Sequence, residues 1–567
     1  MGSEAPTMFV RRASGLVRTV GPFTAFMICF THTVGGGIHK LSVTAAYQYP
    51  AAFVPWSFLI VGLIAAIPTA LVYTIMGTMM PRTGGDYIFI TRGLSPALGF
   101  IASWGFWFTE VLSYGIIAWY SIDFFTGAVT AAGIALNDEG LLSTAAWMNT
   151  MSGHIILSLI FVIVFGAIAF LGMRIYGWII NILGTIAILG CLSNIVILSV
   201  WGSNPVNAVA AFNSMFGANA YQKIVAKAFE LGSPPVQPFS WAATINAGVG
   251  AIWAYIGIVS AVFVGGEIKT PATSLVIAQI LGTLVIMAYY IALPFLFYTS
   301  WQVPQSVLQS TGAMSWLQSH GVPADRVYFT ALYAYVYNKL GVKGLAELMG
   351  VPPTHVMPWN AVTSFTIPLV PKGLAWLQIF NGFVVGIILL KDIPAFFVVA
   401  SRMVFAWAFD RFFPEVFAAV NETFHSPHWA ILLTMLGGLA GVLLIWANGG
   451  EEGAWVAAAD TSNLYQFAVM TASLAGAVLP YVKPDLYEKS PLKWEIGSVP
   501  VVSIIGAFSF AVNFFFFMVS SAELGVDIWF QQSFWMGLGA FIFAGFLIYN
   551  QRRGIDVRTI YAEIPPA

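Results

Sequence analysis

Ionisable side chains interrupt several long apolar stretches of the sequence, and four of them, His32, Glu110, Lys391 and Asp392, lie well inside their stretch. If these stretches cross a membrane, a charged group there costs at least about 2.5–3.5 kcal/mol on insertion scales, so it needs a partner or a function. Burial disfavours the charged form, which lets such a group bind or release a proton near physiological pH. We predict that these four residues include a proton carrier. The alternative is a structural role, as hydrogen-bonded interior groups or, for Lys391 and Asp392, as a static ion pair.

Glycine clusters interrupt two of the apolar stretches. Gly35, Gly36 and Gly37 are consecutive near the middle of one, and another has glycines on both sides of the segment 253–260. Adjacent glycines are costly in a helix interior and leave backbone groups without helical partners. Freed N–H groups at the start of a half-helix attract an anion, and freed carbonyls hold a cation or an ammonium group. Two such breaks would suit a zwitterion; for any single glycine, close helix packing is the alternative.

Composition identifies the surroundings of these groups. Of 567 residues, 59% are hydrophobic and 8% are charged, and the mean hydropathy is +0.82. A soluble domain needs roughly a quarter of charged residues to cover its surface, whereas lipid-facing surface needs almost none. The chain is therefore predicted to be an all-α membrane protein whose surroundings are the lipid bilayer. Its net charge of −1 argues against nucleic acid as a partner.

The sequence divides into twelve predicted transmembrane helices, because a membrane-spanning helix needs about 20 predominantly apolar residues. Their limits are 20–47, 52–79, 95–125, 153–172, 175–201, 241–266, 273–300, 374–400, 428–448, 461–482, 498–520 and 530–550. Interrupted spans in corresponding positions, the first and the sixth, indicate an inverted repeat of five plus five spans. We predict one membrane domain over 1–567, with a first repeat over 1–201, a second over 241–482 and two appended C-terminal helices over 498–550.

Basic residues predict the orientation, since Lys and Arg concentrate in cytoplasmic loops. Fifteen fall on the side of the two termini: Arg11, Arg12, Arg18, Arg82, Arg92, Arg174, Lys269, Arg402, Arg411, Lys483, Lys489, Lys493, Arg552, Arg553 and Arg558. Six fall on the other side: Lys223, Lys227, Arg326, Lys339, Lys343 and Lys372. Both termini are therefore predicted to be cytoplasmic. The long connection 301–373 becomes extracellular. Its segment 325–349 has the apolar spacing of a helix, which is either an interfacial or lid helix or one that only packs on the surface.

Four motifs occur in an order and spacing that resemble the amino acid/polyamine/organocation permeases. They are Gly35-Gly36-Gly37-Ile38, the segment Pro81-Arg82-Thr83-Gly84-Gly85-Asp86-Tyr87, the pair Trp253-Ala254-Tyr255-Ile256-Gly257 and Gly266-Glu267-Ile268-Lys269-Thr270-Pro271, and Ser401-Arg402 followed by Ala406, Asp410 and Pro414. Each is weak alone, and together they are a strong signal that extends over spans 1 to 10.

The resemblance implies the leucine-transporter type of inverted repeat and a site between spans 1, 3, 6, 8 and 10. The backbone of Gly35, Gly36, Gly37 and Ile38 would receive the carboxylate of a substrate. Carbonyls in the segment from Trp253 through Ala254, Tyr255 and Ile256 to Gly257 would receive its amino group. The sequence also departs from the family, because Gly36 replaces a serine and Val259 stands where some proton-driven members have a glutamate. A lysine that some members carry in span 5 is missing as well.

These features predict a secondary active transporter in the cytoplasmic membrane that carries amino acids, related amines or organic anions by alternating access. A proton is favoured as the coupled ion, with His32, Glu110, Lys391 and Asp392 as candidates. The alternatives are substrate exchange, or sodium coupling with Ser401 as a candidate ligand. A passive channel would need a filter or charged rings, which the sequence lacks. An enzyme is not expected, because no nucleophile motif or metal-ligand cluster is present. No cofactor is expected either. The sequence does not determine the substrate or the oligomeric state.

Overall fold

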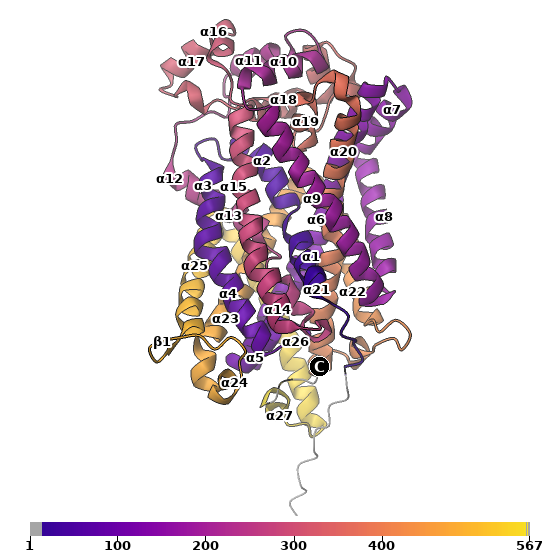
Figure 1. Cartoon of the computed structure of the whole chain (residues 1–567), viewed down its shortest axis with the longest axis vertical. Coiled ribbons are helices and arrows are strands. Elements are labelled where there is room, and N and C mark those ends of the chain that lie inside the picture. Colours follow the sequence, from indigo (N-terminus) through magenta and orange to yellow (C-terminus); the bar gives the residue numbers. More distant parts are fainter. Residues whose placement is uncertain (1–13, 563, 565–567) are drawn as a thin grey trace, which may run out of the picture.

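The computed structural model describes residues 14–562 and 564, without the side chains of 451–461, 523, 524, 527, 558, 559 and 562. Arg11 and Arg12, counted above as cytoplasmic, and the side chain of Arg558 lie outside this description. Long helices run along the long axis of the molecule, with shorter ones across its upper end (Figure 1). Both ends of the described chain lie at the opposite, lower end.

Within the described residues, 11 helices are long and apolar enough to cross a membrane. They are built from α3 (Val54–Val61) with η1 (Gly62–Ala66) and α4 (Ile67–Met79), α6 (Pro96–Leu136), α8 (Met151–Ala169), α9 (Gly172–Val200), α12 (Trp241–Asn246) with α13 (Gly248–Tyr255) and η2 (Ser260–Phe263), α14 (Pro271–Leu275) with η4 (Val276–Leu281) and α15 (Gly282–Ser300), η8 (Lys372–Leu374) with α20 (Ala375–Leu390) and α21 (Asp392–Phe409), α22 (His428–Ala447), α23 (Glu451–Val482), α25 (Val501–Leu524) and α26 (Val526–Arg552). They correspond to the predicted spans 2 to 12.

The remaining predicted span, 20–47, consists of two shorter helices, α1 (Pro22–Thr33) and α2 (Gly36–Gln48). Neither is long enough to count as an uninterrupted crossing, which is why 11 helices qualify rather than 12. The sequence-based prediction that this segment breaks at its glycines is confirmed.

Three predicted limits are wrong by nine residues or more. Helix α6 continues to Leu136 rather than 125, α21 continues to Phe409 rather than 400, and α23 begins at Glu451 rather than 461. At 1.5 Å per residue the 41 residues of α6 extend about 60 Å, twice the apolar thickness of a bilayer. A hydropathy window finds the part of a helix that lies inside the bilayer. The helix itself continues until its backbone leaves the helical conformation. For α6 that is Asn137, which has left-handed φ and ψ angles of 53° and 46°.

A cap of short helices covers the upper end of the bundle (Figure 1). It contains α7 (Glu139–Met148), α10 (Pro205–Phe216), α11 (Ala220–Glu230), α16 (Gln305–Ser310), α17 (Ala313–Ser319), α18 (Phe329–Met349) and α19 (Thr363–Thr366). The first half of α18 is buried against α2 and α11. The helix predicted in 325–349 is therefore present, but it packs into the cap rather than lying on the surface.

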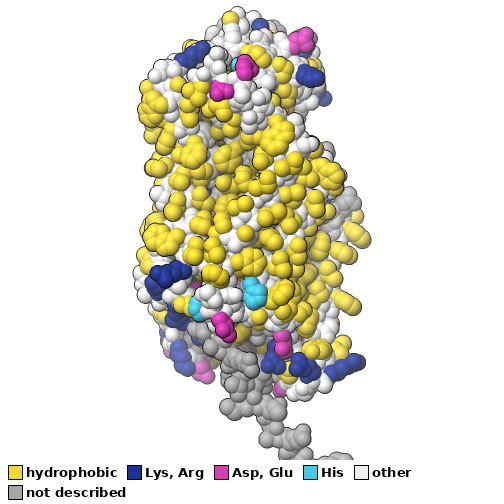
Figure 2. Space-filling view, turned by 90° about the vertical axis from the view of Figure 1, so that its right-hand side faces the viewer, with side chains coloured by type: hydrophobic (Ala, Val, Ile, Leu, Met, Phe, Trp, Pro, Cys, Tyr) yellow, Lys and Arg dark blue, Asp and Glu magenta, His cyan; other side chains and the backbone are white. Residues whose placement is uncertain are grey.

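The lower end carries α5 (Asp86–Gly93), α24 (Pro484–Glu488), α27 (Val557–Ala562) and a two-stranded hairpin, β1 (Glu495–Ile496) with β2 (Val499–Pro500). Figure 2 shows a broad belt of apolar side chains between two ends where Lys, Arg, Asp and Glu gather. A belt of this kind is the surface that a lipid bilayer requires.

The broken helices α1 and α2 lie inside the bundle, where α9, α15 and α21 contact α1, and α13, α15 and α18 contact α2. Every residue from Gly36 to Ala46 is buried. The polar groups that the break releases are therefore enclosed by protein, and they must find partners within it.

Candidate functional site

The break in the first span is held open by close contacts that only glycine allows. A Cβ atom on Gly35 would overlap the carboxylate of Asp392, and one on Gly37 would overlap the backbone of Ala254 in the other broken helix. At Gly36 a Cβ atom would lie 2.8 Å from Cδ1 of Ile117 and 3.6 Å from the ring of Trp253. The three glycines thus let α2 approach α13, α21 and α6 at one point.

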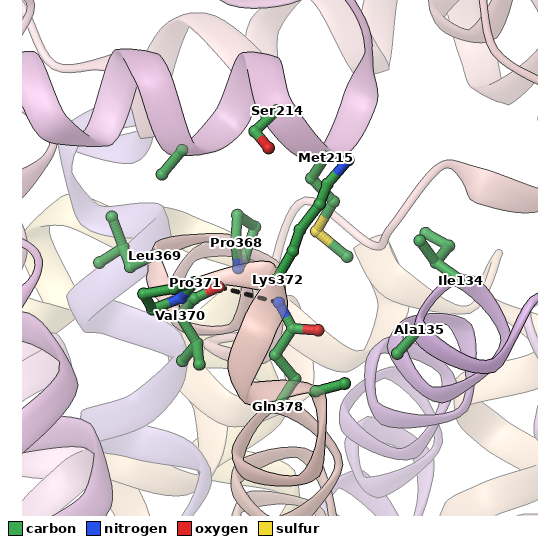
Figure 3. Close-up of a pocket in the computed structure, with 12 residues that line it drawn as sticks. Ile134, Ala135, Ser214, Met215, Pro368, Leu369, Val370, Pro371, Lys372 and Gln378 are labelled. Atoms are coloured by element: carbon green, nitrogen blue, oxygen red, sulfur yellow. Dashed lines mark hydrogen bonds between the residues drawn. The ribbon is translucent and has the colours of Figure 1, made fainter.

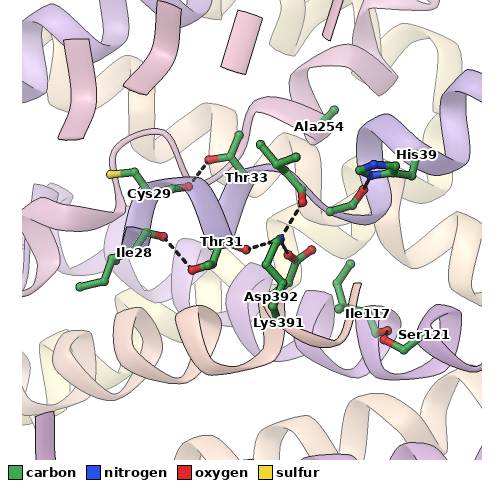
Figure 4. A network of polar contacts seen from close by, with 12 residues as sticks. Ile28, Cys29, Thr31, Thr33, His39, Ile117, Ser121, Ala254, Lys391 and Asp392 are labelled. Atoms are coloured by element: carbon green, nitrogen blue, oxygen red, sulfur yellow. Dashed lines mark hydrogen bonds and ion pairs between the residues drawn. The ribbon is translucent and has the colours of Figure 1, made fainter. Parts of the chain in front are cut away.

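Lys391 and Asp392 lie side by side at this break (Figure 4). The Lys391 ammonium group donates to the carbonyls of Thr31 at 3.0 Å and Val34 at 2.6 Å, and it forms an ion pair with Asp392. The Asp392 carboxylate accepts a hydrogen bond from the N–H of Gly36, the first residue of α2. A cation therefore sits at the C-terminal end of α1 and an anion at the N-terminal end of α2, as the helix dipoles favour.

The second break follows Tyr255 at the end of α13, and the chain resumes a helical form only in the short 3-10 turn η2 (Ser260–Phe263). Gly257 has a φ of 106°, and a Cβ atom there would collide with the backbone of His32. The break predicted in the sixth span is present, and it lies directly against the last turn of α1.

The two aromatic residues at this break point to different places. Trp253 lies beside Gly36. The hydroxyl of Tyr255 instead donates to the carbonyl of Phe58 in α3 at 3.2 Å, and its ring packs on Phe58 and Tyr290. Ala254, the next candidate, contacts Gly37.

His32 and Glu110 form a buried polar pair next to both breaks. His32 Nε2 lies 3.2 Å from Glu110 Oε2, and both side chains are fully buried. The other ring nitrogen, Nδ1, hydrogen-bonds the hydroxyl of Ser260, which opens η2. Among the described residues, neither Glu110 oxygen accepts a hydrogen bond of ordinary geometry.

Tyr290 of α15 and Ser260 were not predicted as site residues. The Tyr290 hydroxyl is placed to donate to the carbonyl of Thr33 at the first break or to that of Ala254 at the second, the latter at 2.8 Å. Tyrosine is common in apolar helices, so the sequence does not distinguish Tyr290 from other tyrosines. Only its position between the two breaks identifies it as a site residue. Ser401, the candidate sodium ligand, donates to the carbonyls of Phe397 and Val398 within its own helix.

The loop motifs contact one another at the lower end of the bundle. The Arg402 guanidinium donates to both oxygens of Glu267, at 2.9 and 3.1 Å. The Arg92 guanidinium likewise binds Asp410, at 2.7 and 3.2 Å. Thr83, in the loop after the second span, pairs with Val264 through a single antiparallel β-bridge. These pairs tie the ends of four spans together below the breaks.

Asp86 lies at the start of α5 in the same region. Its side chain is buried, and the hydroxyl of Tyr73 lies 3.4 Å from its Oδ2. Burial raises the pKa of Asp86 to about 7. A carboxyl in this state is half protonated near neutral pH.

An open pocket at the cap end, of about 290 Å³, does not include the breaks (Figure 3). It is lined by Lys372, Met215, Ile134 and Gln378 among others, and the Gln378 amide donates to the carbonyl of Val370 at 2.9 Å. Gln378 lies in α20, nearer to the cap than the Lys391–Asp392 pair. The pocket lining includes none of His32, Glu110, Lys391 and Asp392, which lie at the breaks.

Comparison with known proteins adds independent evidence. A family model described as amino acid permease matches residues 20–543. A probable polyamine transporter of Arabidopsis thaliana is 27% identical over 180 residues, which are 31% of this chain and 32% of the relative. Arginine/agmatine antiporters of Chlamydia pneumoniae and Chlamydia caviae are 26% and 23% identical, over 46% and 75% of this chain and 49% and 71% of theirs.

The matched segments thus span about a third and a half of the first two of these relatives. The family model, in contrast, covers nearly the whole chain and includes both broken helices and all four motifs. This chain therefore belongs to the amino acid permease family, a family of membrane transporters rather than enzymes, within the amino acid/polyamine/organocation superfamily.

Proposed function

We propose that the protein is a secondary active transporter that moves amino acids or related amines across the cytoplasmic membrane by alternating access. The observation that carries this proposal is the contact of two broken helices at the centre of the bundle, where Gly37 meets Ala254 and Gly257 meets His32. Broken helices free backbone groups for a substrate, and rocking of two repeats around such a point exposes it to either side in turn.

In this proposal α1 and α2 together make a twelfth crossing. Spans 1 to 5 and 6 to 10 form two repeats of opposite orientation, the last two helices are an addition, and both termini lie in the cytoplasm. Support comes from the equivalent placement of the two breaks, five spans apart, and from the excess of basic residues at the end of the molecule that carries both described chain ends.

The substrate site is proposed to lie between the two breaks, with the backbone of 35–38 on one side and the segment 253–257 on the other. Trp253 is the aromatic wall, since it lies beside Gly36. The cytoplasmic path is closed by the pairs Arg402–Glu267 and Arg92–Asp410, whose four side chains are buried. Opening to the cytoplasm would separate or move these pairs.

A proton is the proposed coupling ion. The Thr31 and Val34 carbonyls, which a sodium ion would need at the first break, both accept hydrogen bonds from Lys391. The Ser401 hydroxyl donates to carbonyls within α21 and accepts a hydrogen bond from the Arg402 guanidinium, so a sodium ion there would compete with a cation of the protein itself. The buried groups His32, Glu110, Lys391 and Asp392 offer proton-binding sites next to the breaks instead.

Uptake into proteoliposomes tests this function. Labelled amino acids and amines would be presented under an imposed proton gradient, an imposed sodium gradient, or neither. We expect accumulation driven by the proton gradient and abolished by an uncoupler. Accumulation with sodium alone would contradict the coupling, exchange that ignores both gradients would identify an exchanger, and flux that only equilibrates the substrate would identify a channel.

A further inference from the structure

The first break already holds one positive and one negative group of the protein itself. The ammonium group of Lys391 binds the carbonyls of Thr31 and Val34, and the carboxylate of Asp392 binds the N–H of Gly36. A free amino acid presents the same two groups, an ammonium and a carboxylate a few bonds apart. The Lys391–Asp392 pair therefore takes the place that the two charges of a zwitterion would take at this break.

This occupation is tight. Asp392 fills the space beside Gly35 so closely that a Cβ atom there would overlap its carboxylate. Both side chains are at most 2% exposed. Removing one partner of such a buried pair is costly, because the other charge stays buried without compensation. A second carboxylate at the same helix end would in addition be repelled by the first, and like charges in contact cost several kcal/mol.

An acceptor for a positive group lies nearby. Glu110 is fully buried, and within the described residues its two oxygens receive no hydrogen bond of ordinary geometry, although His32 lies 3.2 Å away. His32 in turn contacts Gly257 and Ser260 at the second break. The other cation close to the first break, Lys40, has its charge 3.3 Å from the centre of the Tyr120 ring, which already stabilises it.

We infer that the Lys391–Asp392 pair remains in place during transport and that the substrate is an organic amine without a carboxylate beside its amino group. The inference rests on the proposed transport function and narrows its substrate class. An α-amino acid is excluded because Asp392 holds the N–H group that its carboxylate would need. An amine lacks that group and is bound between Glu110 and the carbonyls of the second break.

Matched pairs of compounds test this inference directly. Each pair is an α-amino acid and the amine left when its carboxylate is removed: arginine and agmatine, lysine and cadaverine, tyrosine and tyramine. Binding to the purified protein is measured by ligand-dependent thermal stabilisation, and uptake is measured in proteoliposomes. We expect at least one amine to bind at least about tenfold more tightly than its parent amino acid, since a like-charge contact costs more than the 1.4 kcal/mol that tenfold represents.

A variant should relax this selectivity. Asp392→Ala frees the N–H of Gly36 for the carboxylate of an amino acid. The ratio of the affinity for the amine to the affinity for its parent amino acid should therefore fall by about tenfold or more, because the amino acid binds more tightly. Asp138→Ala is the matched control, because Asp138 also places a carboxylate on helix N–H groups, those of Gly140 and Leu141 at the start of α7, far from the breaks. It should leave the ratio unchanged. Lys391→Ala/Asp392→Ala replaces the single variant if that one does not fold.

The outcomes separate the inference from the function on which it rests. Wild-type protein that transports α-amino acids at least as well as the matched amines would overturn the inference and leave the transport function standing. An unchanged ratio in Asp392→Ala and in the double variant would overturn it as well. If no amino acid or amine binds or moves, the proposed function itself fails.

Discussion

His32 Nε2 lies 3.2 Å from Glu110 Oε2. His32 belongs to α1 of the broken first span and Glu110 to the continuous helix α6, and the two helices meet next to both breaks. The pair has no exposed surface, so any proton that it gains or loses must pass through the protein. It also contacts the second break through Ser260. A change in its protonation would therefore be felt at the proposed substrate site.

Glu110→Gln should flatten the pH dependence of proton-driven uptake, and it should weaken but not abolish the exchange of an amine, because the proposed acceptor of the amine's positive group loses its charge. The amide keeps the size of the side chain but cannot carry the proton. Uptake is measured in proteoliposomes between pH 5 and 8, with exchange of labelled for unlabelled substrate measured alongside. Glu139→Gln, at an exposed residue in the first turn of α7, serves as the control and should keep the wild-type profile. A sodium requirement together with an unaltered profile in Glu110→Gln would leave the pair a structural one.

Gly35→Ala should lower substrate binding by at least about tenfold, whereas Gly36→Ala should have a smaller effect. The added methyl group at Gly35 overlaps the Asp392 carboxylate, which is fixed by Lys391 and Gly36. At Gly36 the obstacle is the end of the Ile117 side chain, which can move. Gly36→Val adds bulk towards Trp253 and should abolish binding with the fold retained. Substrate binding is measured by thermal stabilisation, and helix content checks that each variant folds. Wild-type affinity in all three variants would mean that the break is not part of the substrate site.

Lys391→Met should destabilise the protein by about 3–5 kcal/mol, because it leaves the Asp392 carboxylate buried without its partner. Lys391→Met/Asp392→Asn removes both charges and should be destabilised less than the sum of the two single variants. Thermal unfolding in detergent measures all three. Additive losses would mean that the two side chains do not act as a pair.

The sequence predicts the breaks well because three adjacent glycines and the glycines around 253–260 are local signals. From the sequence, an ion pair between Lys391 and Asp392 is the alternative to a proton-carrying role, and the structure forms this pair. The sequence does not reveal that Lys391 reaches the carbonyls of Thr31 and Val34, because that contact joins spans about 360 residues apart. Nor does local sequence reveal which polar group fills the freed end of α2.

Orientation at the second break shows the same limit. The sequence alone does not distinguish Trp253 from Tyr255 as a cavity wall, since each stands beside the interruption. The structure turns Trp253 towards Gly36 and Tyr255 towards Phe58 in α3. Which side of a half-helix faces a partner depends on the angle at which the helix breaks, and backbone angles such as the φ of 106° at Gly257 are not written in hydrophobic periodicity.

This difference makes a prediction for the two aromatic residues. Trp253→Ala should reduce uptake strongly, since it opens a space beside Gly36, and Tyr255→Phe should act mainly on stability by removing the hydrogen bond to Phe58, worth about 1 kcal/mol. Uptake and thermal unfolding are measured for both. Loss of uptake in Tyr255→Phe with Trp253→Ala unaffected would reverse the assignment of the cavity wall.

Asp86 gives the protein a pH-dependent stability that can be measured without a substrate. Burial raises its pKa from 3.8 to about 7. Between about pH 4 and pH 7 the folded state therefore binds more protons than the unfolded state, and stability falls as the pH rises through this range. A tenfold change in proton affinity corresponds to about 1.4 kcal/mol, so the total fall is on the order of a few kcal/mol.

Asp86→Asn should remove this contribution, because the amide does not titrate and can still accept from the Tyr73 hydroxyl. The variant should match wild type near pH 4 and exceed it in unfolding temperature at pH 7.5. Asp485→Asn, at an exposed carboxylate of α24 at the same end of the molecule, is the control and should keep the wild-type slope. Because other groups also titrate, the difference between variant and wild type is the decisive quantity. A difference that does not change between pH 4 and 7.5 would mean that Asp86 is ionised throughout and is stabilised by a partner rather than destabilised by burial.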